Sequence, residues 1–308
     1  MKYKTVDQQL DHFTVNVLQK KIVPYTRYRG YAEAGLFGLL YLLRRNKNEC
    51  VVLSNFRKLA ERIIQQRYDS VTDIPFLEWS DIGFVFYWDN IEQSYIILYP
   101  GGSKDLFTVG LKQCIRCKGT RFVISILTLK TKEGQYHANI VLYDIQTHTL
   151  ERFDPYEAPP PGMNLDHLDN LLREAYVELD PDVNFIHTAK LSFFQGWQYS
   201  QEHEGERHIR DPIGLCQPHT ILYADTRMSF PNQDPGSIPL LFANAAKSHN
   251  MSLTMFSRNY AEHLHESLET IFARFTKKQH RYENFDNVRV PVLALVLEQL
   301  ALYKTVFT

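Results

Sequence analysis

Cysteine is scarce in this sequence, with four thiols among 308 residues, at positions 50, 114, 117 and 216. Their number and scattered spacing do not predict a disulfide framework, and a chain that does without one is typical of a reducing compartment. Internal repeats and low-complexity tracts are also missing. These absences exclude a disulfide scaffold and a repeat architecture.

Long apolar runs and an excess of one charge are missing as well. A membrane-spanning helix needs about 18–20 apolar residues, and no stretch of the sequence approaches that length. The first residues, MKYKTVDQQLDHF, lack the apolar core of a secretion signal. Lys and Arg number 34 against 35 Asp and Glu, a formal charge of −1, so no polybasic excess indicates nucleic acid or an anionic membrane. We therefore expect an intracellular protein that binds neither.

What is present is typical of a folded globular protein, with 44% apolar and 22% charged residues. Residues 1–103 are predicted to form an α-rich region, with helices over 31–44 and 51–68, which could dock a substrate or partner. The Pro-Gly-Gly-Ser joint at 100–103 marks the expected boundary with a second unit, 104–308.

The second unit is predicted to begin with strands, over 122–129, 137–144 and 149–154, the last two joined as a hairpin by 145–148. Further elements are expected over 165–179 (helix), 183–194 (strand), 217–230, 238–248, 257–277 and 291–304 (helices). Strands framed by helices predict the α+β class.

Cys216 is the first candidate for chemistry. Gly214 permits a tight approach before it, and Pro218 suits the first turn of a helix after it. A sulfur at a loop-to-helix junction meets the positive end of the helix dipole, which favours the nucleophilic thiolate. A plain buried core cysteine is the alternative interpretation.

His137 and Asp154 are predicted to meet across the hairpin. If 145–148 form the loop, Asp144 pairs with Thr149, and counting outward sets Asn139 opposite Asp154. His137 is then a diagonal neighbour of Asp154, about 7–8 Å away at the backbone and within side-chain reach. A one-residue slip would put the two on opposite faces. An imidazole held by a carboxylate is a pre-oriented base, although Asp154 before Pro155 also fits a simple strand-ending turn.

The order His137, Asp154, Gln198, Cys216 resembles that of the ubiquitin-like-protein-specific cysteine proteases, the SUMO-protease family, and in particular the divergent members of large eukaryotic DNA viruses. The resemblance is carried by the histidine strand, by LERFDP at 150–155 and by DPIGLC at 211–216, within about 120–230. It implies a papain-like, SUMO-protease-like core, a mixed sheet framed by helices, preceded by an N-terminal helical region.

Carried over by position, Cys216 would be the nucleophile, His137 the general base and Asp154 the orienting carboxylate. Gln198 would donate to the oxyanion, with Gln195 and Gln201 as competing candidates. The resemblance implies a cysteine peptidase without a cofactor. Its protein substrate would be a viral precursor polypeptide or a ubiquitin-like conjugate, cut after a glycine-rich motif in the host cytoplasm or the virion.

Two alternatives stay open. An acyltransferase of the same clan would share the catalytic order, although that group usually carries glutamate at the acidic position. A catalytically inactive structural or binding protein is suggested by Gln217, which stands where the cellular proteases have glycine.

Metal and nucleotide sites are not expected. Cys114 and Cys117 form a lone CxxC without the second pair of ligands that a structural zinc site needs. The segment 100–104 lacks the spacing of a phosphate-binding loop.

Overall fold

Strands predominate in the first part of the described chain and helices after Ile186. The computed structural model describes residues 28, 30, 32–46, 48–54, 77–157, 162–191, 215–276 and 305–307. Over these ranges the elements are, in order, α2 (Ala32–Arg45), β1 (Glu49–Leu53), α4 (Trp79–Ile82), β2 (Gly83–Asp89), β3 (Ser94–Leu98), α5 (Lys104–Arg116), β4 (Phe122–Lys130), β5 (Tyr136–Asp144), β6 (Thr149–Phe153), α6 (Leu165–Val177), β7 (Asn184–Ile186), α7 (Thr188–Leu191), α9 (Cys216–Ser229), η1 (Pro235–Ser237), α10 (Ile238–Ser248), α11 (Leu253–Thr276) and β8 (Thr305–Phe307).

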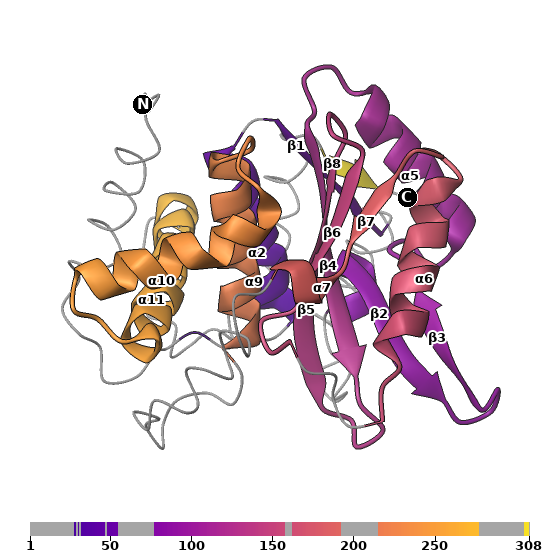
Figure 1. Ribbon diagram of the computed structural model, residues 1–308, viewed down its shortest axis with the longest axis horizontal. Coiled ribbons are helices and arrows are strands. Elements are labelled where there is room, and N and C mark those ends of the chain that lie inside the picture. Colours follow the sequence, from indigo (N-terminus) through magenta and orange to yellow (C-terminus); the bar gives the residue numbers. More distant parts are fainter. Residues whose placement is uncertain are drawn as a thin grey trace.

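A mixed eight-stranded sheet organises these elements (Figure 1). Its main path is β3-β2-β4-β5-β6-β7, while β1 pairs with β4 and β8 pairs with β1. The β2–β3, β4–β5 and β5–β6 pairs are antiparallel, and the β1–β4, β2–β4 and β6–β7 pairs are parallel. The described part of the chain is therefore an α+β structure with a mixed sheet framed by helices, as the sequence predicts at this coarse level.

Both faces of the sheet are covered, because its central strands are apolar on both sides. In β4, Ile124 and Ile126 belong to one buried cluster, which contains residues of α2, α9, α10 and α11. Val123 and Leu127 belong to the other, with residues of α5 and α6. Alternate side chains of a strand point to opposite faces, and a near-continuous apolar run is the pattern of a strand buried on both. Figure 1 shows these two helical layers on either side of the sheet.

Strands β1 and β2 share one edge of β4. Glu49–Val51 pair with the first half of β4, and Gly83–Tyr87 with the second half. At Gly83 a Cβ atom would lie 2.0 Å from the carbonyl oxygen of Ile126. Glycine is required there because the two backbones approach too closely for any side chain.

The N-terminal third differs from the predicted α-rich region. The helix expected over 31–44 is confirmed as α2, but the one expected to begin at Val51 is wrong there, because Val51–Leu53 lie in β1 and pair with β4 and β8. Residues 55–68 lie outside the described residues. The boundary expected at 100–103 falls between β3 and α5, and strands on both sides of it belong to the same sheet.

Helix α5 has no counterpart among the predicted elements. It begins after Ser103, whose hydroxyl accepts a hydrogen bond from the Leu106 N–H at 3.2 Å. This is the capping signal that serine supplies at a helix start. The joint at 100–103 is thus a turn with positive φ at Gly101 and Gly102, followed by a cap.

A disulfide joins Cys50 on β1 to Cys114 on α5, with 5.7 Å between the two Cα atoms. The expectation that the cysteines do not pair is therefore wrong, and the argument for a reducing compartment loses its basis. The partners are 64 residues apart, and they meet because α5 packs over β1 in the second core cluster. Cys117 and Cys216 are free.

The remaining elements follow the sequence more closely. Strands β4, β5 and β6 and helices α6, α9, α10 and α11 lie where they are predicted. The strand expected over 183–194 is wrong beyond Ile186, since α7 begins at Thr188, and the helix expected over 291–304 lies outside the described residues. No helix in the described ranges has the length and apolar character to cross a bilayer.

Candidate active site

Cys216 is the first residue of α9, at the loop-to-helix junction that the sequence predicts. Helix α9 is buried along nearly its whole length because β5 contacts it on one side and α2 and α11 on the other. The sulfur is therefore held against β5, where it accepts a hydrogen bond from the Ala138 N–H at 3.5 Å. A thiol at this position also experiences the positive end of the helix dipole.

The hairpin β5–β6 has the predicted register, with Asp144 opposite Thr149 and Ile140 opposite Phe153. Continuing this register by one residue sets Asp154 beside Asn139, so that His137 is its diagonal neighbour. The two side chains do meet, with His137 Nε2 2.7 Å from Asp154 Oδ1. The pairing across the hairpin is confirmed.

Asp154 is fully buried at the end of β6. Its Oδ1 accepts a second hydrogen bond, from the Tyr156 N–H at 2.9 Å. The guanidinium of Arg152 lies on the other side, with Nη1 3.8 Å from Oδ2. Pro155 ends the strand here, so the carboxylate is fixed by a turn and does not continue the ladder.

The electrostatics of the three groups favour a charged pair. Burial lowers the pKa of His137, but the Asp154 carboxylate, with a contribution from the Cys216 sulfur, overcomes this and raises it to about 10. Burial opposes ionisation of Cys216, yet the hydrogen bond and charge of His137, with N–H groups of Ala138 and Gln217, lower its pKa. The arrangement can therefore hold a thiolate beside an imidazolium, the form in which cysteine attacks carbonyl carbon.

The carboxylate stays ionised in spite of its burial. Burial raises the pKa of Asp154, but His137, then Arg152 and the Tyr156 N–H, hold it below its usual range. Because Nε2 of His137 is engaged with Asp154, Nδ1 is the ring nitrogen left to face the sulfur. One ring nitrogen thus meets the carboxylate and the other is free to serve Cys216, the division of roles that a carboxylate-oriented base requires.

Three of the four predicted site residues are thus brought together, namely Cys216, His137 and Asp154. The fourth, Gln198, lies outside the described residues, as do its competitors Gln195 and Gln201. Their role in an oxyanion hole stays a prediction. In the described ranges no group of three or more His, Cys, Asp or Glu side chains could hold a metal ion.

Gln217, which stands where the resemblance led us to expect glycine, has its side chain accommodated away from the sulfur. Its side chain is buried and accepts a hydrogen bond from the Tyr28 hydroxyl at 2.9 Å. Its amide nitrogen packs against Gly35 of α2, where a Cβ atom would lie only 2.8 Å away. Gln217 therefore packs against α2, and Gly35 leaves it the space to do so.

His219, a second histidine on α9, was not singled out from the sequence. It lies one turn beyond Cys216 and shares a hydrogen bond with Ser257 Oγ at 2.6 Å. Burial, together with the charge of His137, lowers its pKa to about 3. His219 is thus neutral at ordinary pH and helps to pack α9 against α11.

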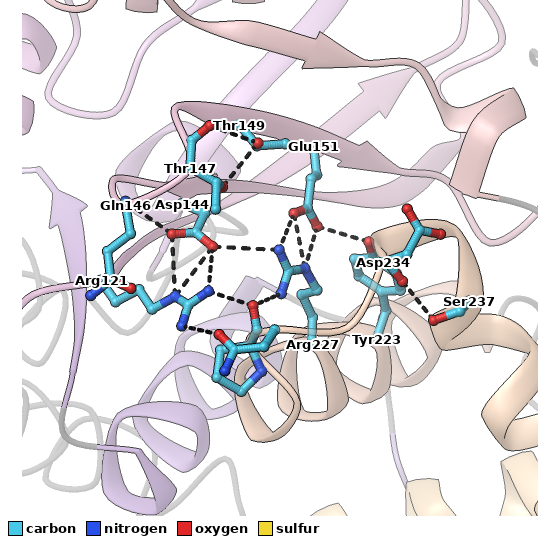
Figure 2. A network of polar contacts seen from close by, with 12 residues as sticks. Arg121, Asp144, Gln146, Thr147, Thr149, Glu151, Tyr223, Arg227, Asp234 and Ser237 are labelled. Carbon is cyan, nitrogen blue, oxygen red and sulfur yellow. Dashed lines mark hydrogen bonds and ion pairs between the residues drawn. The ribbon is translucent and has the colours of Figure 1, made fainter. Parts of the chain in front are cut away.

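A buried polar network anchors the far end of α9 to the hairpin (Figure 2). Arg227 donates from Nε to Glu151 Oε1 at 2.9 Å, and the Tyr223 hydroxyl donates to Glu151 Oε2 at 2.9 Å. Arg121 adds an ion pair to Asp144 at 3.0 Å. The sequence feature that could have indicated this network is Glu151, a charged residue within a strand buried on both faces. The spacing of the sequence does not identify the residues that pair with it.

The comparisons with known proteins do not support the expected family. No family model matches the chain. The chain is 20% identical over 283 residues to a candidate ankyrin repeat protein of Acanthamoeba polyphaga mimivirus. The match covers 88% of this chain and 36% of that protein, so the chain spans about a third of the relative's length.

The expected membership of the SUMO-protease family is therefore wrong. The motifs behind it describe a thiol, an imidazole and a carboxylate in a particular order, and such constellations recur on unrelated folds. The similarity to the mimivirus protein, at 20% identity, does not assign the chain to a family.

Proposed function

We propose that this chain is a cysteine-type hydrolase that cleaves a peptide or isopeptide bond. The observation that carries the proposal is the position of His137, hydrogen-bonded through Nε2 to Asp154 at 2.7 Å and interacting with the Cys216 sulfur. A buried thiol with a lowered pKa, a base and an orienting carboxylate form the set that nucleophilic catalysis by cysteine requires.

The bond-making and bond-breaking steps use the Cys216 thiolate, His137 and one water molecule. The Cys216 thiolate attacks the carbonyl carbon and forms a C–S bond, and the carbonyl oxygen takes the negative charge. His137 transfers its proton to the leaving amine as the C–N bond breaks, which leaves a thioester. A water molecule that gives its proton to His137 then attacks the thioester, the C–S bond breaks, and the thiolate is restored.

The oxyanion would form next to the start of α9. The positive end of the helix dipole stabilises negative charge there. Gln198 remains the proposed side-chain donor, a contribution of about 3–4 kcal/mol in comparable sites. A nucleophile at the start of a helix that packs on a histidine-bearing strand is also what supports a papain-like core as the finer description of the fold.

Substrate and location are proposed on grounds separate from the reaction type. The viral precursor and the ubiquitin-like conjugate were implied by the resemblance, and they lose that basis with it. The mimivirus relative supports a viral setting, and within it the host cytoplasm and the virion are the proposed locations. The ankyrin repeats in the relative's description do not describe this chain, whose described residues form one sheet with two helical layers.

The decisive experiment compares two free thiols of one protein. We expect iodoacetamide to alkylate Cys216 at neutral pH much faster than Cys117, with mass spectrometry resolving the two sites. His137→Ala should remove the advantage, because the thiolate loses its partner. Equal rates at Cys216 and Cys117 in the wild type would refute the proposal and favour an inactive binding protein.

A reporter panel then separates the possible reactions. Peptides and ubiquitin-like conjugates with a glycine-glycine cleavage site, offered to the wild type and to Cys216→Ala, detect hydrolysis. Acetyl-coenzyme A detects acyl transfer, through acetylation of Cys216. A Cys216-dependent transfer without hydrolysis would replace the hydrolase by an acyltransferase.

A further inference from the structure

The catalytic carboxylate has one oxygen that hydrogen bonds leave unused. Asp154 Oδ1 receives both His137 and the Tyr156 N–H, whereas the buried Oδ2 accepts no hydrogen bond from a described residue. A buried carboxylate oxygen without compensation is costly. Arg152 Nη1, 3.8 Å from Oδ2, supplies a positive charge on this side.

Arg152 is itself held by three hydrogen bonds to two side chains. It lies on β6 two residues before Asp154, which directly follows the strand. Its Nε and Nη2 donate to the two oxygens of Asp169, Nη2 at 3.2 Å, and its Nη1 donates to Asn139 Oδ1 at 2.9 Å. The side chain is 2% exposed. A bidentate carboxylate pair of this kind fixes the plane of the guanidinium as well as its position.

The anchor of Arg152 comes from another layer of the fold. Asp169 lies on α6, and its Oδ2 also pairs with His187 Nδ1 at 3.0 Å. A line of alternating charge thus runs from α6 to the site, from Asp169 to Arg152 to Asp154 to His137. Arg152 carries the one positive charge between two carboxylates in this line.

We propose that Arg152 is a positioning residue for the reaction inferred above, which holds Asp154 ionised and turned so that Oδ1 faces His137. It touches neither substrate nor sulfur and acts through Asp154. Because the guanidinium of Arg152 lies on the Oδ2 side, Oδ1 is the oxygen left to accept from His137. Asp169 serves this arrangement by keeping the guanidinium from swinging toward other partners.

The test is the pH dependence of Cys216 alkylation in Arg152→Gln. A nearby opposite charge lowers a carboxyl pKa by about 1–3 units. Without the charge of Arg152, Asp154 takes up a proton at higher pH. The His137 imidazolium then lacks its carboxylate partner, and the Cys216 thiolate is protonated at a higher pH on acidification. We expect the acid limb of the rate profile to move up by about one pH unit, and Arg152→Lys, which keeps the charge, to restore most of the wild-type profile.

Arg121→Gln is the matched control, since Arg121 also pairs with a buried carboxylate of the same hairpin, Asp144. It should lower the thermal midpoint without moving the acid limb. An unmoved limb in folded Arg152→Gln, or an equal shift in Arg121→Gln, would overturn the positioning role. Alkylation needs no substrate, so the two proposals can fail separately. A reactive Cys216 whose acid limb does not move in Arg152→Gln would refute the role of Arg152 alone. A Cys216 that is unreactive in the wild type would refute the proposed function.

A second measurement covers the case in which Arg152→Gln does not fold. Carboxyl carbons of ¹³C-labelled aspartate are titrated by NMR in the wild type, and the Asp154 signal is assigned by its loss in Asp154→Asn. Asp154 is expected to titrate below the ordinary aspartate range. Titration at or above that range would show that Arg152 does not hold the carboxylate ionised.

Discussion

Replacing Asp154 by asparagine tests the central contact of the site with little change of shape. Asparagine keeps an oxygen that can accept from His137 Nε2, but it loses the charge. The rise of the His137 pKa from 6.5 to about 10 corresponds to on the order of 4–5 kcal/mol of preference for the imidazolium. The Asp154 carboxylate is the largest cause that acts in this direction.

Loss of even half of that preference would matter. About two pKa units change the ratio of the thiolate–imidazolium pair to the neutral pair about 100-fold. We therefore expect Asp154→Asn to slow alkylation of Cys216 at neutral pH by at least about tenfold and by up to about 100-fold. The assay is a stopped-time labelling series with iodoacetamide in a Cys117→Ser background, so that one free thiol remains to be counted.

The chain supplies a matched control for this substitution. Asp180 also binds a histidine through Nδ1 at 2.7 Å, but this histidine, His148, is 53% exposed and lies in the hairpin loop after β5, whereas His137 lies at the start of β5. Asp180→Asn should leave the labelling rate of Cys216 unchanged. If Asp154→Asn labels within about threefold of the wild type, a difference under about 1 kcal/mol, the carboxylate does not support the imidazolium and the reasoning fails.

Three further outcomes are expected. Glu151→Gln removes the nearer of the two carboxylates that pair with the buried guanidinium of Arg227, leaving Asp144 at 3.5 Å, and should lower the free energy of unfolding by up to about 3–5 kcal/mol, measured by urea titration. Replacing Cys50 and Cys114 by serine removes the disulfide and should cost about 2–4 kcal/mol in the same assay, with dithiothreitol producing the same loss in the wild type. Since the folded-state pKa of His137 is raised, its contribution to stability is complete below pH 6.5 and is lost as the pH rises toward about 10; thermal melts across that window should show the loss, and His137→Gln should flatten it.

The sequence predicts the part of the site that local rules determine. The register of β5 and β6 follows from a four-residue loop, and counting from that loop brings His137 to Asp154. The start of α9 follows from a glycine, a proline and apolar periodicity around Cys216. These features depend on residues close together in the chain, where turn chemistry and strand alternation are reliable guides.

The parts that were missed depend on contacts between distant segments. The disulfide joins residues 64 apart, and its existence depends on α5 packing over β1. Arg152 meets Asp169 only because α6 lies against that face of β6. The pairing of Val51 with β4 overrides a local pattern that was interpreted as helix. Spacing along the chain carries no signal for any of these encounters.

The pairing of β4 bears on how the protein can be divided. All three residues of the candidate triad lie beyond residue 103, and yet the edge of β4 is completed by β1 and β2 from before it. A fragment starting at Lys104 would contain the whole triad but leave a long apolar strand with its backbone N–H and C=O groups open to solvent. Such an edge recruits other chains, so this fragment should precipitate, whereas co-expression with residues 1–103 as a separate polypeptide should rescue it.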